Sequence, residues 1–337
     1  MRKLVLVTVV LIVATGLAFG GGAGEAASTD PMSGTITLYT SESLTDAQAL
    51  VDRFEQLNPG ATVEIFRLGT TELVARLLTE LEAGQTEADV VWFADMALFE
   101  RFAEDGLLLP IDPPEAANIP EGFIYFDGMA YEVRLIYQII MYNTNLVDRE
   151  ITSWFDLADP AFRGMVGSAS PFVSGATVTQ IASVVQDQNL GWELYEQLAA
   201  NDAVISGGNG GIAQGIALGE YAIGLTIDFM ARTQQEQGSP VNYIFQEEGA
   251  VYVPTPAGVM ASTSNPELST AFVDFLMSVP GQEVLMANGY MPVNVNMPLP
   301  EGVPSPADIP VLSTDWDFLA ENRQMLLDRF AEIFGID

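Results

Sequence analysis

The segment SPFVSGATVT, residues 170–179, places small polar residues where a helix is predicted to begin. The first amides of a helix have no partner inside it, and the helix dipole adds partial positive charge there, so such a position suits a phosphate or a carboxylate. The candidate anion-binding residues of this segment are Ser170, Ser174, Gly175, Ala176 and Thr177. The alternative is that Ser174 only caps its own helix.

Polar residues also follow two predicted strands, at 35–43 and 88–96. Ser41 and Ser43 lie near the end of the first of these stretches, and Asp95 lies near the end of the second. In α/β proteins, ligands gather at the carboxyl ends of the strands. The two hydroxyls could therefore complete an anion site and Asp95 could contact a ligand, although each residue is equally suited to cap the helix that follows it.

The glycine-rich turn SGGNGG, residues 206–211, joins a predicted strand to a predicted helix and contributes Asn209 and Gly210 as candidates. It resembles a phosphate cradle but matches neither a Walker A loop nor a GxGxxG fingerprint, and it lacks the lysine that grips phosphate. We expect either a close approach of this backbone to a ligand or tight packing.

Arg134 is the single basic residue of a long, β-rich stretch, YEVRLIYQIIMYNTNLV at 131–147. An arginine among apolar residues needs a partner for its charge. That partner is either an acid of the site or the anionic group of the ligand.

The chain has no His and no Cys, which excludes a histidine-based triad and a thiol nucleophile. Paired carboxylates could serve a glycosidase, but no motif isolates a pair among the 45 acids. The sequence therefore predicts a protein that is not an enzyme, with no catalytic residues, no disulfides and no cofactor.

The formal net charge of −33 comes from 45 acids and 12 bases. Such a charge argues against partners that are nucleic acids or anionic membranes. It favours a salty habitat, where counter-ions screen the repulsion among carboxylates, over an ordinary acidic secreted protein. It does not identify the ligand, because the charge of the surface is not the charge of the site.

The N-terminus, residues 1–26, has the pattern of a secretory signal peptide. Arg2 and Lys3 precede an apolar run, and the small residues around Gly20 and Ala26 offer two cleavage sites. The chain has no Cys to accept a lipid at either site. These features predict a periplasmic or extracellular protein without a lipid anchor.

Strand and helix patterns alternate along the rest of the chain, which predicts an α/β fold with mostly parallel sheets and helices on both faces. The stretch 131–147 is long enough to leave one lobe and enter another, and 241–261 is predicted to cross back. Amphipathic helices are predicted at 44–60, 70–84 and 313–335.

The sequence resembles the periplasmic solute-binding proteins of ABC importers, in the branch of ferric-iron, sugar-phosphate and 2-aminoethylphosphonate binders. The resemblance covers nearly all of the chain after the signal peptide, and its specificity lies in the order and spacing of several segments together. They are LYTSES, ADVVWFADM, YNTNLV, SWFDLADPAFRGMVG, SPFVSGAT, GNGGIAQGIALGEYAIGLTIDF and EEGAVYVPTPAGV.

The resemblance implies a type II periplasmic-binding-protein fold with a ligand cleft between two lobes, which close on the ligand. It implies a first lobe of residues 34–133 plus 232–290 and a second lobe of residues 134–231 plus 291–337. It also implies delivery to an ABC permease in the inner membrane by a monomeric protein. A ligand sensor of a two-component system remains an alternative role.

The resemblance also implies acidic ligand contacts: Asp228 and one of Glu247 and Glu248 would accept hydrogen bonds from hydroxyls or an ammonium group. Iron-binding relatives carry adjacent tyrosines where this chain has Asp228-Phe229, so a ferric site here would rest on Asp228 and Glu247. We therefore expect a small anionic organic ligand, a sugar phosphate or a phosphonate. Ferric ion and a polyamine remain as alternatives.

Overall fold

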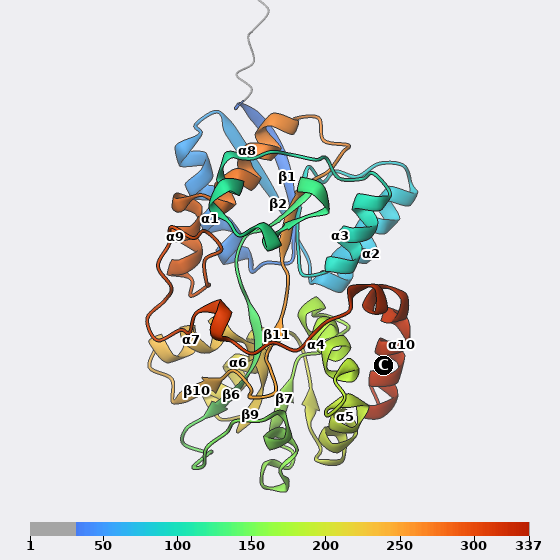
Figure 1. Ribbon diagram of the computed structural model, residues 1–337, viewed down its shortest axis with the longest axis vertical. Coiled ribbons are helices and arrows are strands. Elements are labelled where there is room, and N and C mark those ends of the chain that lie inside the picture. Colours follow the sequence, from blue (N-terminus) through green and yellow to red (C-terminus); the bar gives the residue numbers. More distant parts are fainter. Residues whose placement is uncertain (1–31, 337) are drawn as a thin grey trace, which may run out of the picture. The chain divides into compact units, whose positions relative to one another are not determined.

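The computed structural model describes residues 32–336, so the predicted signal peptide lies outside the described residues. One mixed sheet of six strands organises the first half of this region (Figure 1). Its order is β2 (Ala61–Arg67), β1 (Gly34–Thr40), β3 (Val90–Trp92), β12 (Pro256–Val259), β5 (Ala130–Glu132) and β4 (Ile124–Tyr125). β2, β1 and β3 are parallel, whereas β12 runs antiparallel to both of its neighbours.

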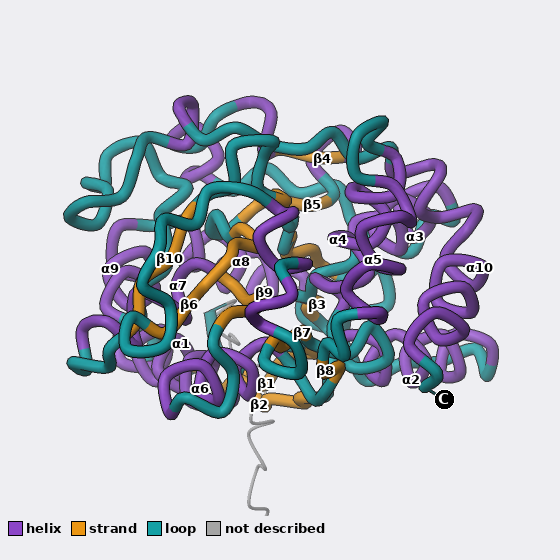
Figure 2. The backbone as a smooth tube through the Cα atoms, turned by 90° about the horizontal axis from the view of Figure 1, so that it is seen from below, coloured by secondary structure: helices purple, strands orange, loops and turns teal. Residues whose placement is uncertain are grey.

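A second mixed sheet organises the other half. Its order is β10 (Val241–Ile244), β6 (Tyr137–Asn143), β9 (Ile223–Ile227), β7 (Val166–Ser168) and β8 (Val204–Ile205), with β11 (Val251–Tyr252) also on β6. β7 is parallel to β8 and β9, and β6 is antiparallel to all of its partners. Figure 2 shows these strands in the interior, with helices to both sides. The α/β class with helices on both faces of the sheets is thus confirmed, and the sheets are mixed rather than mostly parallel.

Helices cover both sheets. Those of the first half are α1 (Leu44–Leu57), α2 (Thr70–Glu82), α3 (Met96–Glu104), α8 (Pro266–Met277) and α9 (Val279–Ala287). Those of the second half are α4 (Gly175–Gln186), α5 (Gly191–Ala200), α6 (Asn209–Leu218) and α7 (Asp228–Glu236). Short 3₁₀ turns lie at η1 (Pro114–Asn118), η2 (Glu121–Phe123), η3 (Phe126–Gly128), η4 (Trp154–Ala158), η5 (Pro160–Phe162) and η6 (Pro306–Asp308). Among residues 32–336, no helix has the length and apolar character needed to cross a bilayer.

The sequence shows why α1 forms where it does. Its apolar residues Ala47, Leu50, Val51 and Phe54 recur at helical spacing, and all four are buried. The Ser43 hydroxyl accepts a hydrogen bond from the N–H of Asp46 at the start of the helix. The terminal helix α10 (Trp316–Phe334) packs against α3 of the first half and against α4 and α5 of the second.

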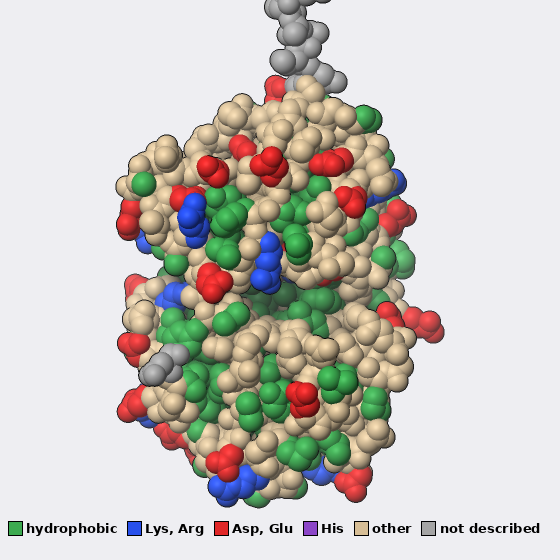
Figure 3. Space-filling model, turned by 180° about the vertical axis from the view of Figure 1, so that it is seen from behind, with side chains coloured by type: hydrophobic (Ala, Val, Ile, Leu, Met, Phe, Trp, Pro, Cys, Tyr) green, Lys and Arg blue, Asp and Glu red, His purple; other side chains and the backbone are tan. Residues whose placement is uncertain are grey.

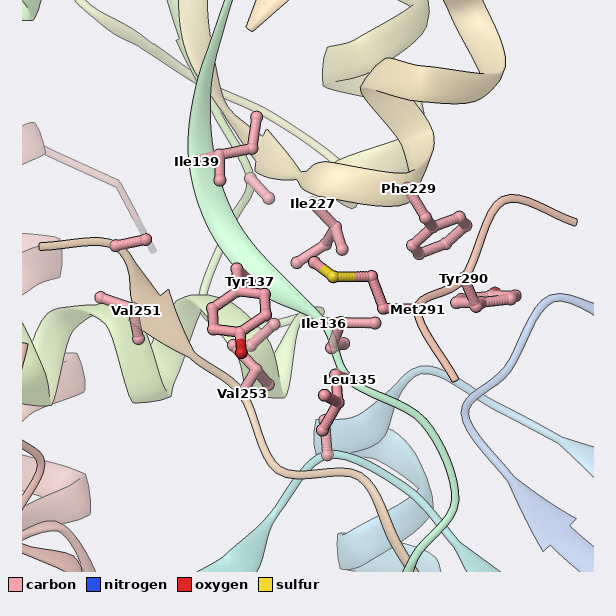
Figure 4. Packing of buried hydrophobic residues seen from close by; sticks show 14 of the residues in the cluster. Leu135, Ile136, Tyr137, Ile139, Ile227, Phe229, Val251, Val253, Tyr290 and Met291 are labelled. Carbon is pink, nitrogen blue, oxygen red and sulfur yellow. The ribbon is translucent and has the colours of Figure 1, made fainter. Parts of the chain in front are cut away.

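Two extended segments connect the sheets. Residues 133–136 lead from β5 to β6, and residues 253–255 lead back from β11 to β12. The two connections are joined directly, because the N–H of Val253 donates to the carbonyl of Ile136 at 3.1 Å. Apolar side chains gather around them, among them Leu135, Ile136 and Met291 (Figure 4).

The strand pairing places the return of the chain to the first sheet later than predicted. The first lobe was expected to resume at residue 232, but β10 and β11 both pair with β6 of the second sheet. The chain therefore returns to the first sheet only at β12, which begins at Pro256. The physical reason is that edge strands of four and two residues find their partner about 100 residues away, in β6, and local patterns do not show this pairing.

Candidate binding site between the two sheets

A cavity of about 300 Å³ lies between the two halves. Its walls come from the ends of strands and the starts of helices on both sheets. The lining residues are Ser41, Glu42, Ser43, Asp46, Arg67, Gly69, Thr70, Ala94, Arg134, Ile136, Val173, Ser174, Ala176, Gly208, Asn209, Gly210, Ile227, Phe229, Met230, Thr255 and Tyr290. Figure 3 shows a hollow between the upper and lower halves of one face, with hydrophobic side chains in its depth.

Five helices begin at this cavity. Each of α1, α2, α4, α6 and α7 follows the carboxyl end of a strand, β1, β2, β7, β8 and β9 respectively. Residues of the first turn or the cap of all five helices line the cavity. Because helix N-termini carry partial positive charge and unpaired N–H groups, their convergence favours an anion.

Three of these helices start without a side-chain cap, and one of them, α7, has Ile227 at its cap position. α2 has Gly69 at its cap position and α6 has Gly208, and neither residue offers a side-chain acceptor to the first amides. α4 is different, because the Ser174 hydroxyl accepts from the N–H of Thr177 at 3.2 Å. The amides of Asn209 and Gly210 at the start of α6 are therefore available to a ligand more directly than those of α4.

Arg67 supplies a positive charge that the protein does not neutralise. Its Nε donates to the carbonyl of Glu42 at 2.8 Å, and a terminal nitrogen donates to the carbonyl of Ser41 at 3.4 Å. Among residues 32–336, no carboxylate forms an ion pair with it. The two carbonyls fix the guanidinium at the cavity without cancelling its charge, so an anion can use it.

Arg134, by contrast, is already neutralised. Both of its terminal nitrogens donate to the carboxylate of Glu42, and both side chains are buried. The guanidinium also stacks on the ring of Tyr290, whose centroid lies 4.1 Å away. Of the two partners expected for Arg134, an acid of the site or the ligand, the structure provides the acid.

The cavity is electrically balanced although the chain is strongly acidic. Its ionisable lining consists of two acids, Glu42 and Asp46, and two arginines, Arg67 and Arg134. Both acids are engaged, since the single hydrogen of the Tyr290 hydroxyl is shared between Asp46, at 2.9 Å, and Glu42, at 3.3 Å. Glu42 and Arg134 cancel each other, so the field inside the cavity is set by Arg67, by Asp46 and by the helix N-termini.

The structure brings seven of the expected ligand-binding residues to the cavity lining. They are Ser41, Ser43, Arg134, Ser174, Ala176, Asn209 and Gly210. Three more lie next to it without lining it. Gly175 and Thr177 are buried in the first turn of α4, and the Ser170 hydroxyl accepts from the N–H of Phe172.

The expected acidic contacts lie elsewhere. Asp228 is fully buried, and its two oxygens accept from the N–H of Tyr137 at 2.8 Å and from Arg232 at 2.6 Å. The Glu248 carboxylate accepts from Ser153 and from the N–H of Trp154, while Glu247 is exposed on its turn. None of these three acids lines the cavity, so the structure does not bring them to a ligand.

Asp95 has a structural role on both sides of its carboxylate. One oxygen accepts from the N–H of Leu98 at the start of α3, and the other forms an ion pair with Arg323 of α10 at 2.5 Å. The capping role that the sequence left open is therefore the one observed, and α10 adds a second partner.

Sequence reasoning missed Glu42, Asp46, Arg67, Phe229 and Tyr290. Arg67 had a signal: it is one of few bases in the chain and the last residue of β2, where the rule for strand ends places ligands. Glu42 stands between two serines that were singled out. Tyr290 had no signal, because it follows α9, far along the chain from the other walls.

The donor set fits an anion better than a metal ion. Within residues 32–336, no group of three or more Asp and Glu side chains comes together in a way that could hold a metal. Tyr290 is the tyrosine of the lining, and burial raises the pKa of its hydroxyl well above the ordinary value.

The chain is similar to known transport proteins. It is 26% identical over 288 residues to iron uptake protein A1 of Synechocystis sp., with 80% of this chain and 79% of that protein covered. It is 25% identical over 286 residues to the Fe(3+)-binding periplasmic protein of Serratia marcescens, with 81% and 80% covered.

Solved structures share the fold. The periplasmic binding protein AfuA from Actinobacillus pleuropneumoniae, with exogenous fructose-6-phosphate bound, superposes with a TM-score of 0.81 at 20% identity, over 90% of this chain and 99% of that chain. Iron-bound HitA from Pseudomonas aeruginosa superposes with a TM-score of 0.76 at 23% identity, over 88% and 99%. The type II periplasmic-binding-protein fold is thereby confirmed.

A family model described as bacterial extracellular solute-binding protein matches residues 86–322, more than half of the chain. This is a family of substrate-binding transport proteins and not a family of enzymes, and two of the relatives above are named as periplasmic proteins. The chain belongs to the bacterial extracellular solute-binding proteins, the substrate-capturing components of ABC importers.

Proposed function

We propose that this protein captures a small organic anion with a phosphoryl or phosphonyl group and delivers it to an ABC permease. The observation that carries the proposal is the convergence of five helix N-termini and Arg67 on one cavity. In a chain with a net charge of −33, such a concentration of hydrogen-bond donors and positive charge favours the binding of an anion at this place.

The phosphoryl oxygens would lie against Arg67, the Ser174 hydroxyl and the amides at the start of α6. The rest of the ligand would contact apolar side chains of the lining, Ile136, Phe229 and Met230, which are buried or half-buried. A hydroxyl or an ammonium group on the ligand could donate to Asp46, which is half-buried and not in an ion pair. This acid replaces Asp228, Glu247 and Glu248 in the role expected from the sequence.

Ferric ion is the second candidate, because two relatives are named as iron proteins. The absence of a carboxylate cluster among residues 32–336 does not support it. A polyamine is less suited still, because Glu42 is already paired with Arg134, Asp46 is the single acid of the lining without an ion pair, and Arg67 would repel a polycation. A sensor would use the same site, so only its partner would distinguish that role.

The test is a thermal-shift and calorimetric screen against fructose 6-phosphate, glucose 6-phosphate, 2-aminoethylphosphonate, inorganic phosphate, ferric citrate and spermidine. A ligand at 100 times its Kd stabilises the folded state by about 2.7 kcal/mol, which shifts the melting temperature clearly. We expect phosphate esters or phosphonates to give this shift. A shift with ferric citrate alone would overturn the proposal.

Arg67→Met tests the site itself. Losing a charge-assisted contact to the anion should weaken binding by about tenfold or more. The matched control is Arg53→Met, because Arg53 also has no described ion-pair partner but does not line the cavity. Equal affinities of the two variants would show that Arg67 does not hold the anion.

A further inference from the structure

We propose that Gln138, a buried residue behind the cavity, restricts Ser174 to donating its hydroxyl hydrogen to the ligand. Gln138 would thereby make the site selective for groups that only accept hydrogen bonds. The inference rests on the proposed anion binding and adds a positioning residue to it. Gln138 itself does not line the cavity.

The Ser174 oxygen already receives two hydrogen bonds. It accepts from the N–H of Thr177 at 3.2 Å and from Nδ2 of Asn209 at 2.9 Å. A hydroxyl oxygen has two lone pairs and one hydrogen, so two acceptances use its accepting capacity. Ser174 lines the cavity. Its remaining hydrogen can therefore serve an acceptor on the ligand.

The orientation of the Asn209 amide decides whether Ser174 has this hydrogen to give. In the structure, Nδ2 of Asn209 faces Ser174 and Oδ1 accepts from Nε2 of Gln138 at 3.2 Å. If the Asn209 amide turned over, its oxygen would face Ser174, and Ser174 would donate to Asn209 instead of to the ligand. The position of Asn209 is otherwise fixed, because its carbonyl accepts from the Thr226 hydroxyl at 2.9 Å.

Gln138 is the group that holds the amide of Asn209 in the observed orientation. It lies in β6 between β9 and β11 and is fully buried. Its Oε1 has no hydrogen-bond partner among the described residues. The hydrogen bond from Nε2 to Asn209 is therefore the described interaction of the Gln138 side-chain amide. A donor from Gln138 therefore makes Asn209 an acceptor, and Asn209 in turn makes Ser174 a donor.

This relay predicts discrimination as well as affinity. A phosphoryl oxygen or a carboxylate oxygen accepts the Ser174 hydrogen. An ammonium group or a hydroxyl presented as a donor finds no free lone pair on Ser174. Ser174 thus disfavours cations by the direction of its hydrogen bond, and the positive charge of Arg67 disfavours them as well.

The test is Gln138→Glu, which keeps the size of the side chain and makes its hydrogen bonding depend on pH. When neutral, the new carboxyl can still donate to Oδ1 of Asn209. When ionised, it can only accept, so Asn209 must turn and Ser174 loses its free hydrogen. We expect the Kd for glucose 6-phosphate, divided by that of the unmodified protein at each pH, to rise about tenfold or more from about pH 5.5 to about pH 9.

Gln180→Glu is the matched control. Gln180 is equally buried, sits on α4, and its Nε2 contacts the Tyr195 hydroxyl at 3.2 Å, away from Asn209. The nearby charged groups, Asp228 and its partner Arg232, are the same in both variants. Burial raises the pKa of Tyr137 and Tyr252, the tyrosines on the strands around Gln138, so they stay neutral in this range. The ratio for the control should not change with pH.

The outcomes separate the two proposals. If the unmodified protein binds no anion, both fail. If it binds glucose 6-phosphate and Arg67→Met weakens this binding, but Gln138→Glu behaves as Gln180→Glu at every pH, the relay alone is wrong. Gln138→Met covers the case of a variant that does not fold at high pH: without a donor, Asn209 takes either orientation, and a weaker affinity independent of pH is expected. Unchanged affinity would contradict the relay.

Discussion

Arg134 and Glu42 bury a complete ion pair in the wall of the cavity. The exposed fractions of their side chains are 3% and 6%, and the guanidinium is enclosed by the rings of Trp92, Phe229 and Tyr290. A buried pair of this kind contributes little net stability, but either charge alone is costly because no water can solvate it. The pair joins the end of β1 to the segment that connects the sheets.

Glu42→Gln should therefore destabilise the protein strongly. The change leaves the Arg134 charge buried without its counter-charge, and we expect the free energy of unfolding to fall by about 3–5 kcal/mol. Urea denaturation measures the difference. Asp202→Asn is the control: it breaks the exposed Arg163–Asp202 pair, and asparagine tolerates the positive φ of 54° at that position. Its effect should stay below about 1 kcal/mol. Similar losses in both variants would argue against a buried charge at Arg134.

The site was predictable where function depends on backbone position. Ser174, Asn209 and the two serines near residue 42 follow strand ends, and strand ends can be recognised from local patterns. The partners of charged side chains were not predictable. An aspartate at position 228 could equally face a ligand or Arg232. Only the folded chain shows that it pairs with Arg232, one turn further along α7.

At the scale of elements, the start of α4 is one of the places where the two halves touch. A Cβ on Gly175 would lie 2.3 Å from the carbonyl oxygen of Ala94 and 2.7 Å from the Thr70 methyl, both in the first half. Beside this contact, the Thr71 hydroxyl donates to the carbonyl of Pro171 at 3.2 Å. The start of α4 thus fits against the first half only because residue 175 has no side chain.

Gly175→Ala should keep the halves from meeting in this arrangement. The atom opposed is a backbone oxygen, which cannot move aside as a flexible side chain can, so the halves must separate. We expect a larger radius of gyration by X-ray scattering and weaker anion binding. Gly211→Ala is the control, because a Cβ there meets nothing within 4 Å and alanine favours a helix by up to about 1 kcal/mol. A compact Gly175→Ala variant with normal affinity would contradict the steric argument.

Elements with local signals were predictable and those defined by distant pairing were not. The cap of α1 at Ser43 and the apolar stripe of α10 depend on residues that are close together in the sequence. β10 and β11 have only four and two residues, and they are strands because β6 lies beside them. The boundary expected at residue 232 failed for this reason, while the class of fold did not depend on it.

At the scale of the whole molecule, the acidic charge must reside mainly on the surface. The cavity is balanced, and of the four acids buried among residues 32–336, Glu42, Asp95 and Asp228 are each paired with an arginine, while Glu132 accepts hydrogen bonds from Tyr252 and Thr255. Figure 3 shows acidic side chains dispersed over the face. A net charge of −33 therefore acts as repulsion across a compact surface. This repulsion favours the expanded, unfolded chain.

Salt should therefore stabilise the protein. The Debye length shrinks from about 10 Å at about 0.1 M to about 3 Å at about 1 M, so repulsion between dispersed carboxylates is screened while the buried pairs are hardly affected. We expect the melting temperature to rise steadily with KCl and to rise equally with NaCl. Sucrose at matched osmolality is the control, because it favours compact states without screening charge. A melting temperature that is flat or falls in KCl would mean that exposed ion pairs such as Arg163–Asp202, rather than repulsion among the excess acids, dominate the surface electrostatics.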